Sequence, residues 1–223
     1  MSEAAVMHQT GGSQGGILTG RLGSVLAVAP LGTWVAWHLW ENLYAWQGAQ
    51  AWSQRVTEPG HAVSEAITLL IVFVPLIIHT VWGIRRLAMT RPNGYRFFGN
   101  LKYLLQRLSA IGLFFFIGAH VYLARIHPAF TVASGHEHFA DLAREMRTAP
   151  TLTVYILGIL GTAYHLSNGV YTASFIHGIA ASPRAGRWMQ VISVVLFILL
   201  LTCGWGAVWG LYRAGGALPP GAV

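Results

Sequence analysis

Cysteine and charge are the scarcest features of this sequence. The 223 residues contain one cysteine, Cys203, so no disulfide can form within the chain. Charged residues make up only 9% of the sequence, against roughly 25% in a typical soluble domain. A soluble protein of this length needs a larger polar surface, and the composition therefore excludes that class. Cys203 lies within an apolar segment, where a thiol usually acts as a small apolar side chain.

Long hydrophobic runs take the place of the missing charge. Hydrophobic residues make up 54% of the chain, and five apolar segments approach the roughly 20 residues needed to cross a bilayer. The sequence predicts an all-α integral membrane protein whose five transmembrane helices form one domain over residues 21–212. The predicted spans are Leu22–Trp46, Val63–Ile84, Leu104–Ile126, Leu152–Phe175 and Trp188–Leu211.

The two ends of the chain are predicted to be tails. Residues 1–20 are rich in glycine, serine and glutamine and lack the compact apolar core of a signal peptide, so we expect a flexible N-terminal tail. Residues 213–223 form the C-terminal tail. Insertion into the membrane would then be directed by the first helix itself.

Basic residues outnumber acidic residues by 14 to 7, and their positions predict the topology. They are concentrated in the segments that connect the second span to the third and the fourth span to the fifth: Arg85, Arg86, Arg91, Arg96, Lys102, Arg107, Arg184 and Arg187. By the positive-inside rule these segments and the N-terminus are cytoplasmic, and the C-terminus lies outside. The high pI of about 10.1 therefore reflects membrane topology and does not predict a nucleic-acid partner.

Each of the first four spans contains one histidine: His38, His79, His120 and His165. A polar group inside a bilayer is costly and needs a partner. For a single histidine that partner is often an interhelical hydrogen bond, but four histidines at two matched depths suggest something more. His38 and His120 lie at the outer level, and His79 and His165 lie at the inner level.

This arrangement predicts two stacked haems within a bundle formed by the first four helices, each iron bound by two imidazoles. The haems would be b-type and non-covalent, because the chain has no Cys-x-x-Cys-His motif. Glycines on these helices could let a flat ring approach the backbone, although close helix packing explains each of them equally well. Pro75 lies four residues before His79 and should kink the second span.

One histidine on each of the first four of five spans, together with the motif His165-Leu-Ser-Asn168-Gly169, resembles the dihaem cytochrome b subunit of succinate:quinone oxidoreductases. The resemblance covers residues 20–212. It implies that His79 and His165 hold a proximal haem, and that His38 and His120 hold a distal haem near the outer face. Some fumarate reductases of this family carry a glutamate two residues before the fourth ligand, where this chain has Ala163.

The resemblance also implies partners and a location. Flavoprotein and iron–sulfur subunits would dock on the cytoplasmic side of a bacterial cytoplasmic membrane and handle the dicarboxylate. Electrons would pass through the haems to a membrane quinone, either menaquinone or ubiquinone, within a lipid environment. The subunit itself would carry no catalytic residue for succinate or fumarate.

Quinone chemistry needs a group that can exchange protons near a haem. Glu41 and Glu65 lie on the outer side and are the candidates, although both could be ordinary interfacial acids. The loop histidines His127, His136 and His138 are expected to be solvated or interfacial. Two alternative functions remain open at this stage: a dihaem quinol-oxidising anchor of another respiratory reductase, and a non-haem transporter with a histidine-lined proton path.

Overall fold

A computed structural model describes residues 21–57, 66–88, 98–131 and 135–218. Within these residues every regular element is helical, and five helices are long and apolar enough to cross a membrane. The predicted all-α membrane fold is therefore confirmed. The five spans are Arg21–Gln47, Ala66–Ala88, Leu101–Phe130, Ala149–Ile176 and Pro183–Ala217.

Three of the spans are divided by changes in helical geometry. The first comprises the π-helix η1 (Ala27–Gly32), α2 (Thr33–Asn42) and the 3-10 helix η2 (Leu43–Gln47). The second comprises the π-helix η3 (Leu69–Phe73) and α5 (Val74–Ala88). The third comprises α6 (Phe98–Val121), the π-helix η4 (Tyr122–Ile126) and α7 (His127–Thr131). The fourth and fifth are single helices, α9 (Ala149–Ile176) and α10 (Pro183–Ala217).

Each π-helical segment is associated with a proline. Pro30 lies inside η1, and both η3 and η4 end two residues before a proline, Pro75 and Pro128 respectively. Proline cannot donate to the carbonyl four residues earlier, so the preceding turn loses one hydrogen bond and can widen. The irregularity expected at Pro75 therefore takes the form of a π-helical turn on the N-terminal side of the proline.

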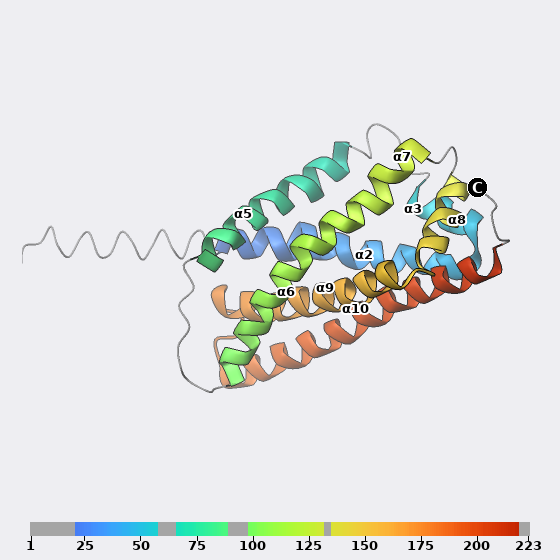
Figure 1. Ribbon diagram of the computed structural model, residues 1–223. Coiled ribbons are helices and arrows are strands. Elements are labelled where there is room, and N and C mark those ends of the chain that lie inside the picture. Colours follow the sequence, from blue (N-terminus) through green and yellow to red (C-terminus); the bar gives the residue numbers. More distant parts are fainter. Residues whose placement is uncertain (1–20, 58–65, 89–97, 132–134, 219–223) are drawn as a thin grey trace, which may run out of the picture.

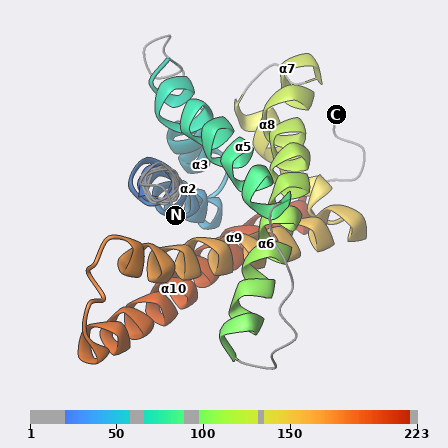
Figure 2. The same cartoon turned by 90° about the vertical axis from the view of Figure 1, so that its left-hand side faces the viewer.

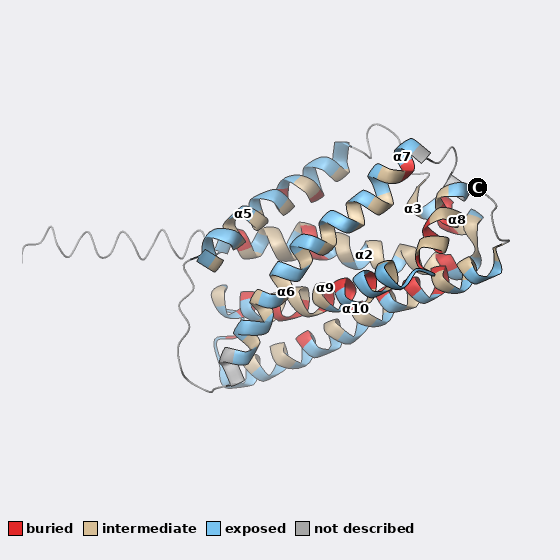
Figure 3. Cartoon of the chain, viewed as in Figure 1, coloured by how far each residue is buried: buried red, intermediate tan, exposed pale blue. Residues whose placement is uncertain are grey.

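Helices α9 and α10 lie side by side and antiparallel, and they form the most closely packed part of the bundle (Figures 1 and 2). Helix α6 crosses α9, and α10 packs against α9 and the first span. Helix α5 has little contact with α6 and reaches the rest of the bundle mainly through η1. Figure 3 accordingly shows buried residues mostly on α9, α10 and the end of the bundle, while α5 and α6 are largely exposed.

Two short helices close one end of the bundle. These are α3 (Ala49–Val56) and α8 (Gly135–Glu145), which pack against each other; α8 also packs against α10, and α3 against η2. With 35 residues at about 1.5 Å each, α10 is about 52 Å long and exceeds a hydrocarbon core of about 30 Å. It continues past residue 212, where the sequence predicted the start of a tail, and its end supports α8.

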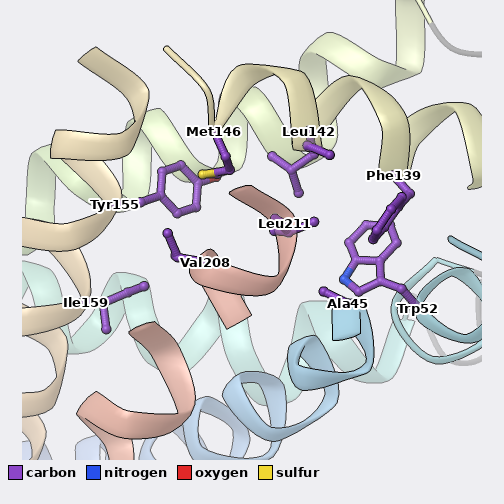
Figure 4. Packing of buried hydrophobic residues seen from close by; sticks show 10 residues of the cluster. Ala45, Trp52, Phe139, Leu142, Met146, Tyr155, Ile159, Val208 and Leu211 are labelled. Atoms are coloured by element: carbon purple, nitrogen blue, oxygen red, sulfur yellow. The ribbon is translucent and has the colours of Figure 1, made fainter. Parts of the chain in front are cut away.

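The buried apolar core lies at this end of the molecule (Figure 4). Trp52 of α3 contacts Phe139 of α8, and Met146 and Leu142 are buried against the end of α10 near Leu211. The topology expected from the basic segments would place this end of the bundle on the outer side of the membrane, and it is called the outer end on that basis. We call α3 and α8, with their buried side chains, the outer cap.

Candidate functional site: four histidines in one cavity

A large cavity runs through the bundle between the outer cap and the inner end. Its volume is about 1910 Å³, and its walls include all four intramembrane histidines. Cavities for drug-sized ligands are usually about 300–1,000 Å³. This cavity therefore has room for more than one ligand of that size.

The structure brings the four histidines together as two pairs. The ring centres of His38 and His120 are 5.8 Å apart with an interplanar angle of 74°. Those of His79 and His165 are 6.2 Å apart with an angle of 76°. Imidazole nitrogens lie about 2 Å from a bound metal, so two imidazoles on opposite sides of one metal have ring centres about 6 Å apart. Both pairs fit a single bis-histidine iron.

The described residues contain no other obvious metal site, because no three or more of their His, Cys, Asp or Glu side chains gather in one place. Two ligands from the protein are too few for an isolated structural ion, which usually takes four. They are sufficient for a haem iron, whose remaining four ligands come from the porphyrin. The donor set therefore fits a haem better than a bare metal ion.

Hydrogen bonds at the inner pair hold one nitrogen of each ring. The Nδ1 of His79 lies 3.2 Å from the Gly23 carbonyl oxygen, which can only accept. The Nδ1 of His165 lies 3.2 Å from Ser109 Oγ, whose own hydrogen is donated to the Gln106 carbonyl at 3.0 Å. In both rings Nδ1 therefore carries the proton, and the lone pair of Nε2 is left for a metal.

In the outer pair, His120 and His38 are held by different kinds of contact. The Nδ1 of His120 lies 3.2 Å from the hydroxyl of Tyr155, which orients the ring; because a hydroxyl can donate or accept, this contact does not by itself decide which nitrogen carries the proton. His38 stacks on Trp34 at 4.7 Å, and its Nε2 has a long 3.4 Å contact with the amide nitrogen of Asn42. That amide already donates to the His38 carbonyl at 2.8 Å, so the contact with the ring is the weaker of the two.

Cations line both ends of the cavity: Arg86, Lys102 and Arg107 at the inner end, and Arg55 and Arg125 at the outer end. Arg107 lies over the ring of Tyr103 at 4.8 Å, and its Nε is buried without a hydrogen-bond partner among the described residues. An orphaned buried guanidinium nitrogen suits an anionic ligand. The carboxylates of a haem are such anions, so this feature agrees with the donor set.

The structure describes some, but not all, of the other residues that the sequence indicated as site candidates. Glu41 lines the outer part of the cavity near Arg55, whereas Glu65 lies outside the described residues. His127 is partly exposed and lies 3.4 Å from Asp141. From the sequence, His138 is expected to be solvated or interfacial; its side chain is partly exposed, but α8 folds onto Trp52 and its Nε2 is buried. The side chain of His136 is not among those described.

The space beside two glycines is filled by side chains of neighbouring helices. A Cβ on Gly158 would overlap the ring of Phe116, and a Cβ on Gly32 would lie 2.9 Å from Leu166. By contrast, a Cβ added to Gly83, Gly112 or Gly118 would meet nothing within 4 Å among the described residues. Close helix packing thus accounts for the first two glycines.

Sequence reasoning missed the residues that orient the histidines. Ser109 and Tyr155 were not singled out, although each is a polar residue within an apolar helix. That feature alone was the available signal, because a polar side chain at membrane depth needs a partner. Their partners, His165 and His120, lie on neighbouring helices and could not be assigned without the fold.

Comparison with curated proteins finds a similar chain, the "Succinate dehydrogenase cytochrome b558 subunit" of Bacillus subtilis (strain 168). The two sequences are 31% identical over 198 residues. The match covers 85% of the present chain and 94% of the relative. No family model matches the sequence.

Proposed function

The chain belongs to the family of succinate dehydrogenase cytochrome b558 subunits, and we propose that it conducts electrons between the rest of that complex and a membrane quinone through two b haems. The observation that carries this proposal is the geometry of the histidines. Two imidazole pairs, with ring centres 5.8 Å and 6.2 Å apart, line one cavity of about 1910 Å³.

The proposed ligands are His79 and His165 for the inner haem and His38 and His120 for the outer haem. The haems would supply one-electron transfer across the bilayer. The protein's own contribution is to hold the imidazoles. Gly23 and Ser109 fix the Nδ1 side of His79 and His165, which leaves Nε2 as the metal-binding atom of these two rings, and Tyr155 orients the ring of His120.

The partners in this proposal are the flavoprotein and iron–sulfur subunits of succinate dehydrogenase. They would dock on the cytoplasmic side, where the basic segment Arg85–Arg107 connects the second and third spans. The inner histidine pair lies towards that side and would exchange electrons with the iron–sulfur subunit. The multi-pass chain would lie in a bacterial cytoplasmic membrane with its N-terminus inside and its C-terminus outside.

The quinone, menaquinone or ubiquinone, would react near the outer haem. The outer end of the cavity supports this placement, because it combines apolar walls with the polar side chains of Glu41, Arg55 and Arg125. Glu65 remains a second acidic candidate from the sequence.

The test is to isolate the complex and measure its haems. The reduced-minus-oxidised spectrum should show a b-type α-band, and a pyridine haemochrome assay should give two haems per chain. His79→Ala should remove the inner haem and His38→Ala the outer haem, each leaving about half of the absorbance. Because the two haems have different surroundings, the retained component should differ in midpoint potential between the variants.

His177→Ala is the matched control. His177 lies at the inner end of α9 and contacts Ser24 Oγ at 2.9 Å, and it is not a proposed ligand. This variant should keep both haems. Absence of a b-type spectrum in the wild type, or full haem content in both ligand variants, would refute the proposal.

A further inference from the structure

His138 occupies a position in the outer cap that the proposed electron path does not use. It is the fourth residue of α8 and meets the ring of Trp52 edge-on, with ring centres 5.5 Å apart at 89°. Its Nε2 is buried and has no hydrogen-bond partner among the described residues. A buried imidazole nitrogen without a partner loses its bond to water and gains nothing in return, so it calls for an occupant.

The His138 side chain faces the cavity that contains the four intramembrane histidines. It lines that cavity together with Trp52, Leu142 and Arg125. Trp52 also connects the cap to the outer histidine pair, because its indole N–H donates to Asn42 Oδ1 at 3.1 Å, and Asn42 donates to the His38 carbonyl. A molecule that reached His138 from inside the bundle would therefore lie next to the helix that carries His38.

The surroundings of His138 connect it to the outer aqueous phase. Asp141 lies one turn further along α8 and pairs with His127 at 3.4 Å, and both side chains are about one-third exposed. Arg125, from the third span, is the cation that acts on His138, and Arg55, from α3, lines the same cavity beside Glu41. His138 is thus one turn from a partly exposed pair of an imidazole and a carboxylate.

The chemistry of this pocket suits the headgroup of a quinone. Its walls include flat aromatic and aliphatic side chains, and among its few polar groups His138 is able to exchange protons. Burial lowers the pKa of His138, with Arg125 acting in the same direction and Asp141 opposing it. A protonated ring in this position gives up its proton readily.

We propose that His138 binds the quinone headgroup at the outer end of the cavity through Nε2 and transfers a proton to its oxygen. This inference rests on the proposed function, since the electrons come from succinate through the complex. The quinone takes up two electrons and two protons to become the quinol. His138 receives a proton from the outer phase by way of His127 and Asp141 and delivers it from Nε2, and the second proton comes from water at the outer face. Quinol oxidation is the reverse.

The test uses the complete complex, haem-loaded and with its partner subunits, and two variants of His138. In His138→Gln the amide can still donate a hydrogen bond but cannot carry a proton, whereas His138→Leu removes both abilities. Succinate oxidation is measured with a soluble dye, which bypasses the quinone site, and with 2,3-dimethyl-1,4-naphthoquinone. Haem content is recorded from the b-type spectrum of each preparation.

We expect both variants to retain dye-linked activity and haem. With the naphthoquinone, His138→Gln should lower kcat by about 100-fold while KM changes by about threefold or less, and His138→Leu should also raise KM. His177→Gln, at the opposite end of the bundle, is the matched control and should behave as the wild type in all three assays.

An unchanged kcat with the naphthoquinone in both variants would overturn the proposal, since Nε2 would then be satisfied by water alone. Loss of haem or of dye-linked activity in both variants would also overturn it, because it would assign His138 a purely structural role in the cap. These variant results differ from a failure of the proposed function itself. If the proposed function were wrong, the wild-type complex would lack the b-type spectrum or would not reduce the quinone.

Discussion

At the scale of single residues, the neighbours of each intramembrane histidine decide which ring nitrogen is available. Gly23 and Ser109 lie on helices other than those of the rings they hold, and an oxygen of each accepts a hydrogen bond from Nδ1. A neutral imidazole has one donor and one acceptor nitrogen, so fixing the donor also fixes the acceptor. The availability of Nε2 in His79 and His165 therefore depends on atoms far away in the sequence.

Ser109→Ala should weaken the inner haem site without removing a ligand. The His165 ring loses its Nδ1 partner, and loss of such supporting contacts commonly reduces metal affinity by about 10-fold to 100-fold. The expected result is faster haem loss and a shifted midpoint potential for the inner haem alone, measured by redox titration and by haem transfer to an acceptor protein.

Ser24→Ala is a closely matched control. Like Ser109, Ser24 donates its hydroxyl to a carbonyl three residues earlier and contacts a histidine, in this case His177. Because His177 is not a proposed ligand, both haems should be retained with wild-type potentials. Equal effects of the two substitutions would contradict the proposed ligand set.

At the scale of helices, close contacts between spans determine how the histidines approach one another. Gly158 on α9 leaves space for the ring of Phe116 on α6. That ring lies 5.8 Å from His120 and 5.5 Å from Tyr155. The contact between the two helices is therefore continuous with the outer histidine pair.

Gly158→Ala should destabilise the bundle and disturb the outer haem. The added Cβ would overlap the Phe116 ring, and overpacking of this kind costs about 1–3 kcal/mol. The measurement is the temperature at which the b-type absorbance is lost in detergent, followed separately for each haem by its potential. The outer haem should be lost at a lower temperature than in the wild type.

Gly161→Ala, one turn away on the same helix, supplies the control. The nearest atom to its added Cβ is the Ser109 carbonyl oxygen at 4.0 Å, so there is room for a methyl group. Alanine also has the higher helix propensity. This variant should be as stable as the wild type or slightly more stable, and a loss equal to that of Gly158→Ala would contradict the packing argument.

At the scale of the whole molecule, the stable core and the proposed redox site occupy different regions. The buried apolar cluster joins the outer cap to the ends of α9 and α10, whereas the centre of the first four spans is a cavity. The outer end is thus closed by protein, and the inner end carries the cations Arg86, Lys102 and Arg107.

The topology can be tested with single cysteines in a Cys203→Ser background. A cysteine replacing Gly94 should react with an impermeant maleimide only after the inner face is exposed, because the basic segment around it should be cytoplasmic. A cysteine replacing Ala222 should react in intact cells. Labelling from the opposite sides would invert the orientation and place His138 on the cytoplasmic side.

The sequence by itself determined the membrane class, the five spans and the four histidines at two depths. These properties are local, since hydropathy sums over one segment and depth follows from position along one helix. It could not show that Ser109 holds His165, that Phe116 occupies the space at Gly158, or that α8 buries His138 against Trp52. Those contacts join segments far apart in the chain and leave no periodic trace in it. Only the tertiary structure decided them.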